Sequence, residues 1–331
     1  MNSANSTFSG SPGKMMSTSG GLVYNMKRYL LHILITSILL PLLFDTPLIF
    51  AQGRQHADLY FMKARELEKQ GKYFEAAEMS ENAVRKERKS SSPRMDVLAS
   101  ALNQAGSCYY MVGQYDKAIE YYKEALGIDE GLENEAGIAR DLNSLGMAYN
   151  SWDKYEKAIN CFEEALEINR KLGMDAEAAV SLNNIGLVYD SWGQYDKAIE
   201  CYNEALVIDK ESGNEAGIAI SLNNIGMVYN AWGKYDKAIT CFEVALNNSL
   251  GQDDQVAITL NNIGYVYDSR GQYEKAIKYY EKALVIDRRL GREASIAEDL
   301  NNIGMVYDSY GLYDKAITYF EEALSENERM K

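Results

Sequence analysis

The chain has 331 residues, enough for two ordinary domains or one long repeat array, and its 47% hydrophobic and 25% charged content indicates a globular protein. The formal net charge of −14 argues against broad binding to a phosphate backbone, which requires clustered Lys and Arg. The four cysteines form no Cys-x-x-Cys pair, so zinc-finger and thioredoxin motifs have no support.

The N-terminal part of the chain differs in composition from the rest. Residues 1–25 are rich in Ser, Gly and Asn and are predicted to be disordered. In residues 26–51, two basic residues precede an apolar run that ends at Phe44, and Ala51 offers a cleavage point. This order of basic, apolar and small residues is typical of a secretory signal. The segment therefore predicts an exported protein, either periplasmic or extracellular.

A signal-anchor is the alternative for residues 26–51. Leu48 to Phe50 prolong the apolar character beyond the interruption by Pro41 and Asp45. The uninterrupted run is short for a membrane span, which needs about 20 apolar residues. Under this alternative the protein stays tethered to a membrane by the segment.

A motif with the pattern Leu-Asn-Asn-Ile-Gly recurs along the remaining chain. Its glycine occurs as Gly106, Gly146, Gly186, Gly226, Gly264 and Gly304. The spacings are 40, 40, 40, 38 and 40 residues, and a fixed period in this range predicts a stacked array of structural repeats. An earlier, degenerate copy begins near residue 58, so we predict about seven repeats over residues 58–331.

Each repeat contains two helical patterns. The first has an apolar face with i, i+3, i+4, i+7 spacing, formed in one copy by Leu222, Ile225, Gly226 and Tyr229. The second has a small–aromatic–small face, formed in that copy by Ala238, Phe242 and Ala245. Gly233 lies between the helices and suits the left-handed conformation after a helix end; Asp153 replaces this glycine once. Asn214 is a candidate N-cap.

These positions resemble the tetratricopeptide repeat family over about residues 58–331. The 40-residue, Asn-rich version is similar to the repeats of kinesin light chain and of the Pins/LGN polarity adaptors, although it lacks the proline near the repeat end. The resemblance implies an all-α, right-handed superhelical solenoid of helix-turn-helix repeats. It also implies that the first helices line a concave groove that binds peptides or partner proteins.

No residue pattern indicates a catalytic or metal site. His56 is the single histidine after the signal-like segment, and it lies at the edge of the repeat array. Three cysteines at equivalent positions are expected to be partly buried packing residues: Cys161, Cys201 and Cys241. Three tryptophans are expected on the buried side of the first helix: Trp152, Trp192 and Trp232. We therefore predict that the protein is not an enzyme and uses no cofactor or metal.

The other face of the first helix carries a large apolar residue among polar ones. The apolar residues are Met147, Leu187, Met227, Tyr265 and Met305. The flanking amides are Asn183, Asn184, Asn223, Asn224, Asn261, Asn262, Asn301 and Asn302, and the carboxylates are Asp190, Asp268 and Asp308. An apolar stripe between hydrogen-bonding rows predicts a groove for an extended peptide with some positive charge. The alternative is that these residues pack on neighbouring first helices and that the asparagines link adjacent helices.

These patterns predict a scaffold or adaptor that binds a peptide or partner protein and no nucleic acid. The alternative is a sensory or regulatory module of a larger signalling system whose effector is absent from this chain.

Repeat arrays need a polar end cap, and none follows the last repeat of this sequence. An uncapped apolar face formed by Ile303, Val306 and Tyr310 therefore predicts self-association, partner docking or a chain that is part of a longer one.

Overall fold

The computed structural model describes residues 57–249 and 253–329. The predicted disordered segment, the predicted signal at 26–51 and His56 lie outside the described residues, so these expectations stay predictions. Within the described ranges, no helix combines the length and the apolar character that crossing a membrane requires.

The described chain is helical throughout and forms seven hairpins, which confirms the predicted solenoid. The first hairpin pairs a helix over residues 57–69 with α3 (Tyr73–Arg88). The next three pair α4 (Met95–Met111) with α5 (Tyr115–Gly131), α6 (Glu135–Ser151) with α7 (Tyr155–Leu172), and α8 (Asp175–Ser191) with α9 (Tyr195–Ser212). The last three pair α10 (Glu215–Ala231) with α11 (Tyr235–Asn248), α12 (Asp253–Ser269) with α13 (Tyr273–Leu290), and α14 (Glu293–Ser309) with α15 (Tyr313–Arg329).

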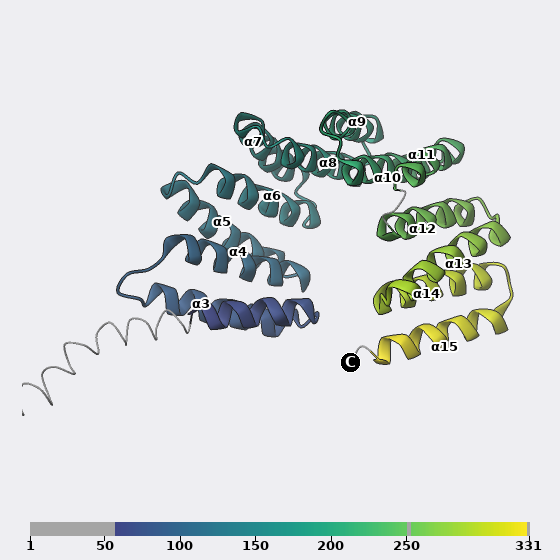
Figure 1. Ribbon diagram of the computed structural model, residues 1–331, viewed down its shortest axis with the longest axis horizontal. Coiled ribbons are helices and arrows are strands. Elements are labelled where there is room, and N and C mark those ends of the chain that lie inside the picture. The colour runs from purple at the N-terminus through teal and green to yellow at the C-terminus, as the bar shows by residue number, and fades with distance from the viewer. Residues whose placement is uncertain (1–56, 250–252, 330–331) are drawn as a thin grey trace, which may run out of the picture.

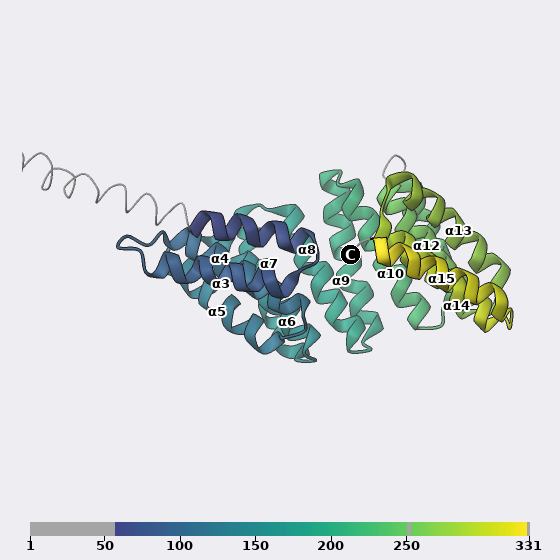
Figure 2. The same ribbon diagram turned by 90° about the horizontal axis from the view of Figure 1, so that it is seen from below.

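The hairpins stack so that their first helices line the inner surface of an arch. From α3 onward, each helix packs against the next one in the chain, and neighbouring first helices also contact each other from α4 to α12. In Figure 1, α8, α10 and α12 lie toward the inside of the arch, and α9 and α11 lie further out. Figure 2 shows the stack from below, with the first hairpins on one side of α9 and the last hairpins on the other. The first helices therefore form the concave surface.

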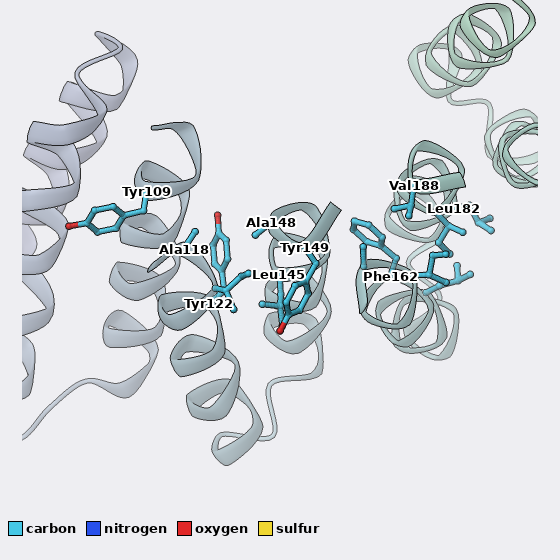
Figure 3. Packing of buried hydrophobic residues seen from close by; sticks show 14 of the residues in the cluster. Tyr109, Ala118, Tyr122, Leu145, Ala148, Tyr149, Phe162, Leu182 and Val188 are labelled. Carbon is cyan, nitrogen blue, oxygen red and sulfur yellow. The ribbon is translucent and has the colours of Figure 1, made fainter. Parts of the chain in front are cut away.

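The repeated glycine allows an aromatic ring of the second helix to lie against the first helix. A Cβ atom at Gly226 would lie 2.6 Å from Cε1 of Phe242, so a larger residue requires movement. Phe162 and Phe242 are completely buried. Figure 3 shows Phe162 beside Leu182 and Val188 of the next hairpin. The ring thus joins both helices of its own hairpin to the hairpin that follows.

Local signals end the helices where the sequence predicts. Gly233 has a φ of +71°, in the left-handed region, and Asp153 adopts the same region with a φ of 54°. The side chain of Asn214 accepts a hydrogen bond of 3.2 Å from the backbone N–H of Gly217 and caps α10. The predicted turn residues and the predicted N-cap are confirmed.

The uncovered apolar face lies one helix later than the sequence suggests. Ile303 and Val306 are 0% and 1% exposed because α15 packs over them, whereas Tyr310 is half exposed. The exposed apolar residues of α15 are Tyr313, Ile317, Phe320 and Leu324. In the preceding hairpin, the residues equivalent to the last three are buried: Ile277, Tyr280 and Leu284. The predicted face is therefore wrong in its residues, and self-association stays a prediction for the face on α15.

Candidate binding groove

Three positions of each first helix form a line along its concave side. They lie six residues before, two residues before and one residue after the repeated glycine, and in α10 they are Ile220, Asn224 and Met227. Residues separated by three or four positions share one face of a helix. The outer two of these positions are seven residues apart, which corresponds to about 10.5 Å along the axis. We call these lines on α4, α6, α8, α10, α12 and α14 the groove face.

The predicted apolar residues occupy the last position of the groove face. Leu187, Tyr265 and Met305 are 37%, 48% and 52% exposed, so core packing leaves them open. Met147 and Met227 are half-buried and also contact core clusters. The row is therefore accessible along its length, and two of its methionines contribute to packing as well.

A second row of exposed apolar residues was missed by the sequence analysis. Val180, Ile220 and Ile258 occupy the first position of the groove face on α8, α10 and α12, and they are 54%, 42% and 45% exposed. The signal that could have found them is the i, i+7 spacing to Leu187, Met227 and Tyr265. On these three helices the groove face therefore carries an apolar residue on each side of an asparagine.

The first asparagine of each pair faces the neighbouring hairpin rather than the open groove. Asn223 is buried, and Asn183 and Asn261 are half-buried. The Nδ2 of Asn183 donates to Oγ of Ser221 at 3.2 Å, and the Nδ2 of Asn223 donates to Oγ1 of Thr259 at 3.0 Å. The Nδ2 of Asn261 donates to Oδ1 of Asp299 at 2.6 Å. These amides hold adjacent hairpins together. Asn301, in the last hairpin, is half-buried.

The second asparagine of each pair lies at the middle position of the groove face and is half-buried. Its Nδ2 donates to Oδ1 of an asparagine in the preceding hairpin, at 3.4 Å from Asn184 to Asn143, 3.4 Å from Asn224 to Asn183 and 3.2 Å from Asn262 to Asn223. Asn302 occupies the same position in α14 and is also half-buried. The amides therefore form a ladder between repeats that fixes their orientation at the floor of the groove.

The three predicted carboxylates lie near the end of the first helices. Asp190 and Asp268 are half-buried, and burial raises the pKa of both carboxyl groups. Asp308 is exposed. All three lie three residues beyond the apolar row, and so beside the groove face rather than between its rows.

Two junctions between hairpins bury a carboxylate where three others bury a hydroxyl. Asp141 and Asp299 are fully buried, at the position that Ser181, Ser221 and Thr259 hold elsewhere. Each accepts a hydrogen bond from an asparagine of the preceding hairpin, while its Oδ2 atom has no partner. Burial raises the pKa of Asp141 to about 7. Burial also raises the pKa of Asp299.

The free energy of unfolding is expected to fall as the pH rises from about 4 to about 7. In the unfolded chain these two carboxyl groups have a pKa near 4. The folded chain therefore holds more protons between about pH 4 and 7, and its stability decreases as they are lost. Urea denaturation should show a loss of about 3 kcal/mol over this range, since one pKa unit corresponds to about 1.4 kcal/mol, and the double variant Asp141→Ser, Asp299→Ser should show a clearly smaller loss. Equal pH slopes for the two proteins would contradict this.

The recurring tryptophans and cysteines differ in how well they match expectation. Trp152 and Trp192 are 42% and 39% exposed, so the predicted buried location is wrong for these two, whereas Trp232 is half-buried. The first two directly follow the ends of α6 and α8, and the Trp192 ring lies 5.7 Å from that of Tyr155 in the preceding hairpin. Packing of these tryptophans between repeats is therefore confirmed.

Cys161, Cys201 and Cys241 are free and half-buried, as expected, and burial raises the pKa of each thiol.

The repeat pattern matches a known sequence family. The tetratricopeptide repeat model matches residues 57–131, 97–171, 137–211, 177–250 and 255–325. Among curated protein sequences, none matches this chain.

Several solved structures share the fold. Aspartyl phosphate phosphatase F from Bacillus subtilis is 19% identical with a TM-score of 0.64, over 86% of this chain and 74% of that chain. The TPR-like repeats of a Podosopora anserina protein described as a kinesin light chain are 17% identical with a TM-score of 0.51, over 60% of this chain and 97% of that chain. A signal transduction ATPase with a tetratricopeptide repeat sensor, from Pyrococcus horikoshii, is 18% identical with a TM-score of 0.57, over 94% of this chain and 48% of that chain. At these identities the likeness shows the fold alone.

Proposed function

The chain belongs to the tetratricopeptide repeat family, and from that premise we propose that it is a non-catalytic scaffold that binds an extended segment of a peptide or partner protein in its concave groove. The observation that carries this proposal is the pair of apolar rows on α8, α10 and α12, formed by Val180, Leu187, Ile220, Met227, Ile258 and Tyr265, all exposed except the half-buried Met227. Burying such side chains against a partner is favourable, at about 25 cal/mol per Å² of apolar area.

The spacing of the rows favours an extended ligand over a helical one. Alternate side chains of a strand point to opposite sides, so they reach the two apolar rows while the backbone lies over the asparagines between them. The Nδ2 groups of Asn184, Asn224 and Asn262 are engaged by the ladder, which leaves their Oδ1 atoms as acceptors for backbone N–H groups. A helix in the same place would cover these acceptors with apolar side chains at a cost.

The apolar rows provide a cleaner test than the asparagines, because the asparagines also join the repeats. Peptides selected from a random display library on the full chain serve as probes. We expect the double variant Ile220→Asp, Ile258→Asp to bind the selected peptides at least about thirtyfold more weakly, since apolar contacts at an interface centre dominate affinity. Its melting temperature should hardly change, because both side chains are exposed.

The matched control is the double variant Val207→Asp, Val285→Asp, which introduces the same charges at exposed valines of the second helices α9 and α13. We expect this control to bind as the unmodified chain does. Equal affinity for the groove variant and the control, with both folded, would refute binding at the groove face.

A second candidate function is a sensory or regulatory module of a larger signalling system. It is supported by the alignment of nearly the whole chain with about half of the Pyrococcus horikoshii signalling protein, whose description includes a tetratricopeptide repeat sensor. The same groove would then receive the signal, and an effector on another polypeptide would respond to it.

Export and self-association are further proposals. Export is supported by the basic, apolar and small residues of segment 26–51, with a membrane tether as the alternative. Self-association is supported by the exposed apolar residues of α15 named above.

A further inference from the structure

The groove changes character at its N-terminal end, where it deepens into a cleft of about 660 Å³. The cleft lies between the helix over 57–69, α4 and the start of α6, and its lining includes Phe61, Arg65, Glu68, Ser100, Gln104 and Ser107. Three of these occupy the groove face of α4, at the positions that hold an apolar residue, an asparagine and another apolar residue on α10. The cleft is therefore a polar continuation of the apolar groove.

Glu68 is a half-buried carboxylate that lacks a cationic partner. Its Oε2 accepts from Nε2 of Gln104 at 3.2 Å, and its Oε1 accepts from Oγ of Ser107 at 3.3 Å. In the described part of the chain, it forms no ion pair with Lys, Arg or His. Glutamates removed from water are normally paired with a positive group. The geometry leaves that place to a ligand.

The other charges around the cleft are of both signs. Asp58 and Asp129, which also line it, are already bound by Arg94 and Arg140. Asp96 adds a further carboxylate at the rim. Arg65 also lines the cleft, and its guanidinium lies 5.8 Å from the centre of the Phe61 ring.

Gln104 provides a second, independent indication of a missing donor. The residue is only 9% exposed, and it lines the cleft. Its Nε2 is held by Glu68, while its Oε1 is buried and accepts no hydrogen bond. An unpartnered buried acceptor of this kind is uncommon and calls for an explanation. A ligand group with several N–H bonds suits this pair, since it can donate to the Glu68 carboxylate directly and to the Gln104 oxygen after the amide turns toward the cleft.

We propose that this cleft recognises a cationic group, an ammonium or a guanidinium, on the same segment whose apolar side chains occupy α8, α10 and α12. The inference rests on the proposed function and assigns the orientation of the bound segment along the groove. The positive charge of the segment lies at the end of the groove that includes the helix over 57–69, several residues from the apolar part of the segment. Glu68, rather than Asp190, Asp268 or Asp308, is the carboxylate that selects it.

The test compares peptides selected from one random library on the full chain, on the variant Glu68→Gln and on the control Glu66→Gln. Glu66 lies on the same helix and is exposed, and it does not line the cleft. We expect Lys or Arg to be enriched at one end of the peptides selected by the full chain and by the control, and not by Glu68→Gln. A selected peptide should bind Glu68→Gln about tenfold more weakly at low salt, with a smaller difference at high salt.

A second measurement changes the peptide, and its main result comes from the unmodified chain. Replacing the peptide's Lys or Arg with norleucine should weaken its binding to the unmodified chain by about tenfold and leave its binding to Glu68→Gln unchanged. If the unmodified chain selects peptides that are rich in apolar residues but lack a terminal cation, this inference is overturned and the proposed function stands. If the unmodified chain selects no peptides at all, the proposed function fails, and this inference fails with it.

Discussion

Replacing Phe242 with alanine should lower the free energy of unfolding by about 3–5 kcal/mol. The ring is completely buried and packs against Gly226 of its own hairpin. It also belongs to a core cluster with Ile263 and Val266 of the next hairpin. The surrounding helices are tied to their neighbours on both sides, so they cannot close over the cavity. The loss therefore includes both the transfer of the ring and the empty space that remains.

The matched control is Phe320→Ala, which removes the same ring at the equivalent position of α15. Phe320 is 36% exposed because no described helix packs over it. We expect a loss of about 1–2 kcal/mol there, since less apolar area leaves water in the folded state. Urea denaturation followed by circular dichroism measures both. Similar losses for the two variants would show that the next hairpin contributes little to the burial of this ring.

Gly226→Ala should destabilise the protein by about 1–3 kcal/mol, even though alanine is the better helix former. The new methyl group would lie 2.6 Å from Cε1 of Phe242 and 2.7 Å from its Cζ. The buried ring cannot turn away without disturbing its neighbours, so the clash outweighs the gain in helix propensity. The variant should unfold at a lower urea concentration with little change in helical content.

The control for this substitution is Gly127→Ala within α5, where an added Cβ meets nothing within 4 Å. Helix propensity acts alone at that position, so we expect a gain of up to about 1 kcal/mol. A gain at both glycines would mean that the close approach of helix and ring is not needed. A loss at Gly226 that disappears when Phe242 is replaced by leucine would confirm the contact as the cause.

The groove could be predicted in outline from the sequence, although its composition could not. The helical period correctly placed Leu187, Tyr265 and Met305 on the open side. The same period also contained Val180, Ile220 and Ile258, but a β-branched residue near the start of a helix is not by itself evidence of exposure. The cleft around Glu68 could not be found this way, because its walls come from three separate helices.

The partners of the paired asparagines could not be predicted from the sequence. Asn223 and Asn224 are adjacent and chemically identical, and only the stacked structure separates them. Asn223 is buried and binds Thr259 of the next hairpin, while Asn224 reaches back to Asn183 of the previous one. A residue's position on its own helix does not tell which neighbouring hairpin its side chain meets.

The sequence by itself determined the repeat, the two helices of each hairpin, the glycine turns and the cap at Asn214. All of these depend on contacts within about 20 residues, where the geometry of the helix and the turn leaves few choices. The tertiary structure decided which faces stay open: the exposed side of Trp192, the burial of Ile303 beneath α15 and the polar cleft at the N-terminal end. These depend on the angle at which one hairpin packs on the next, and that angle results from all the side chains of the interface together.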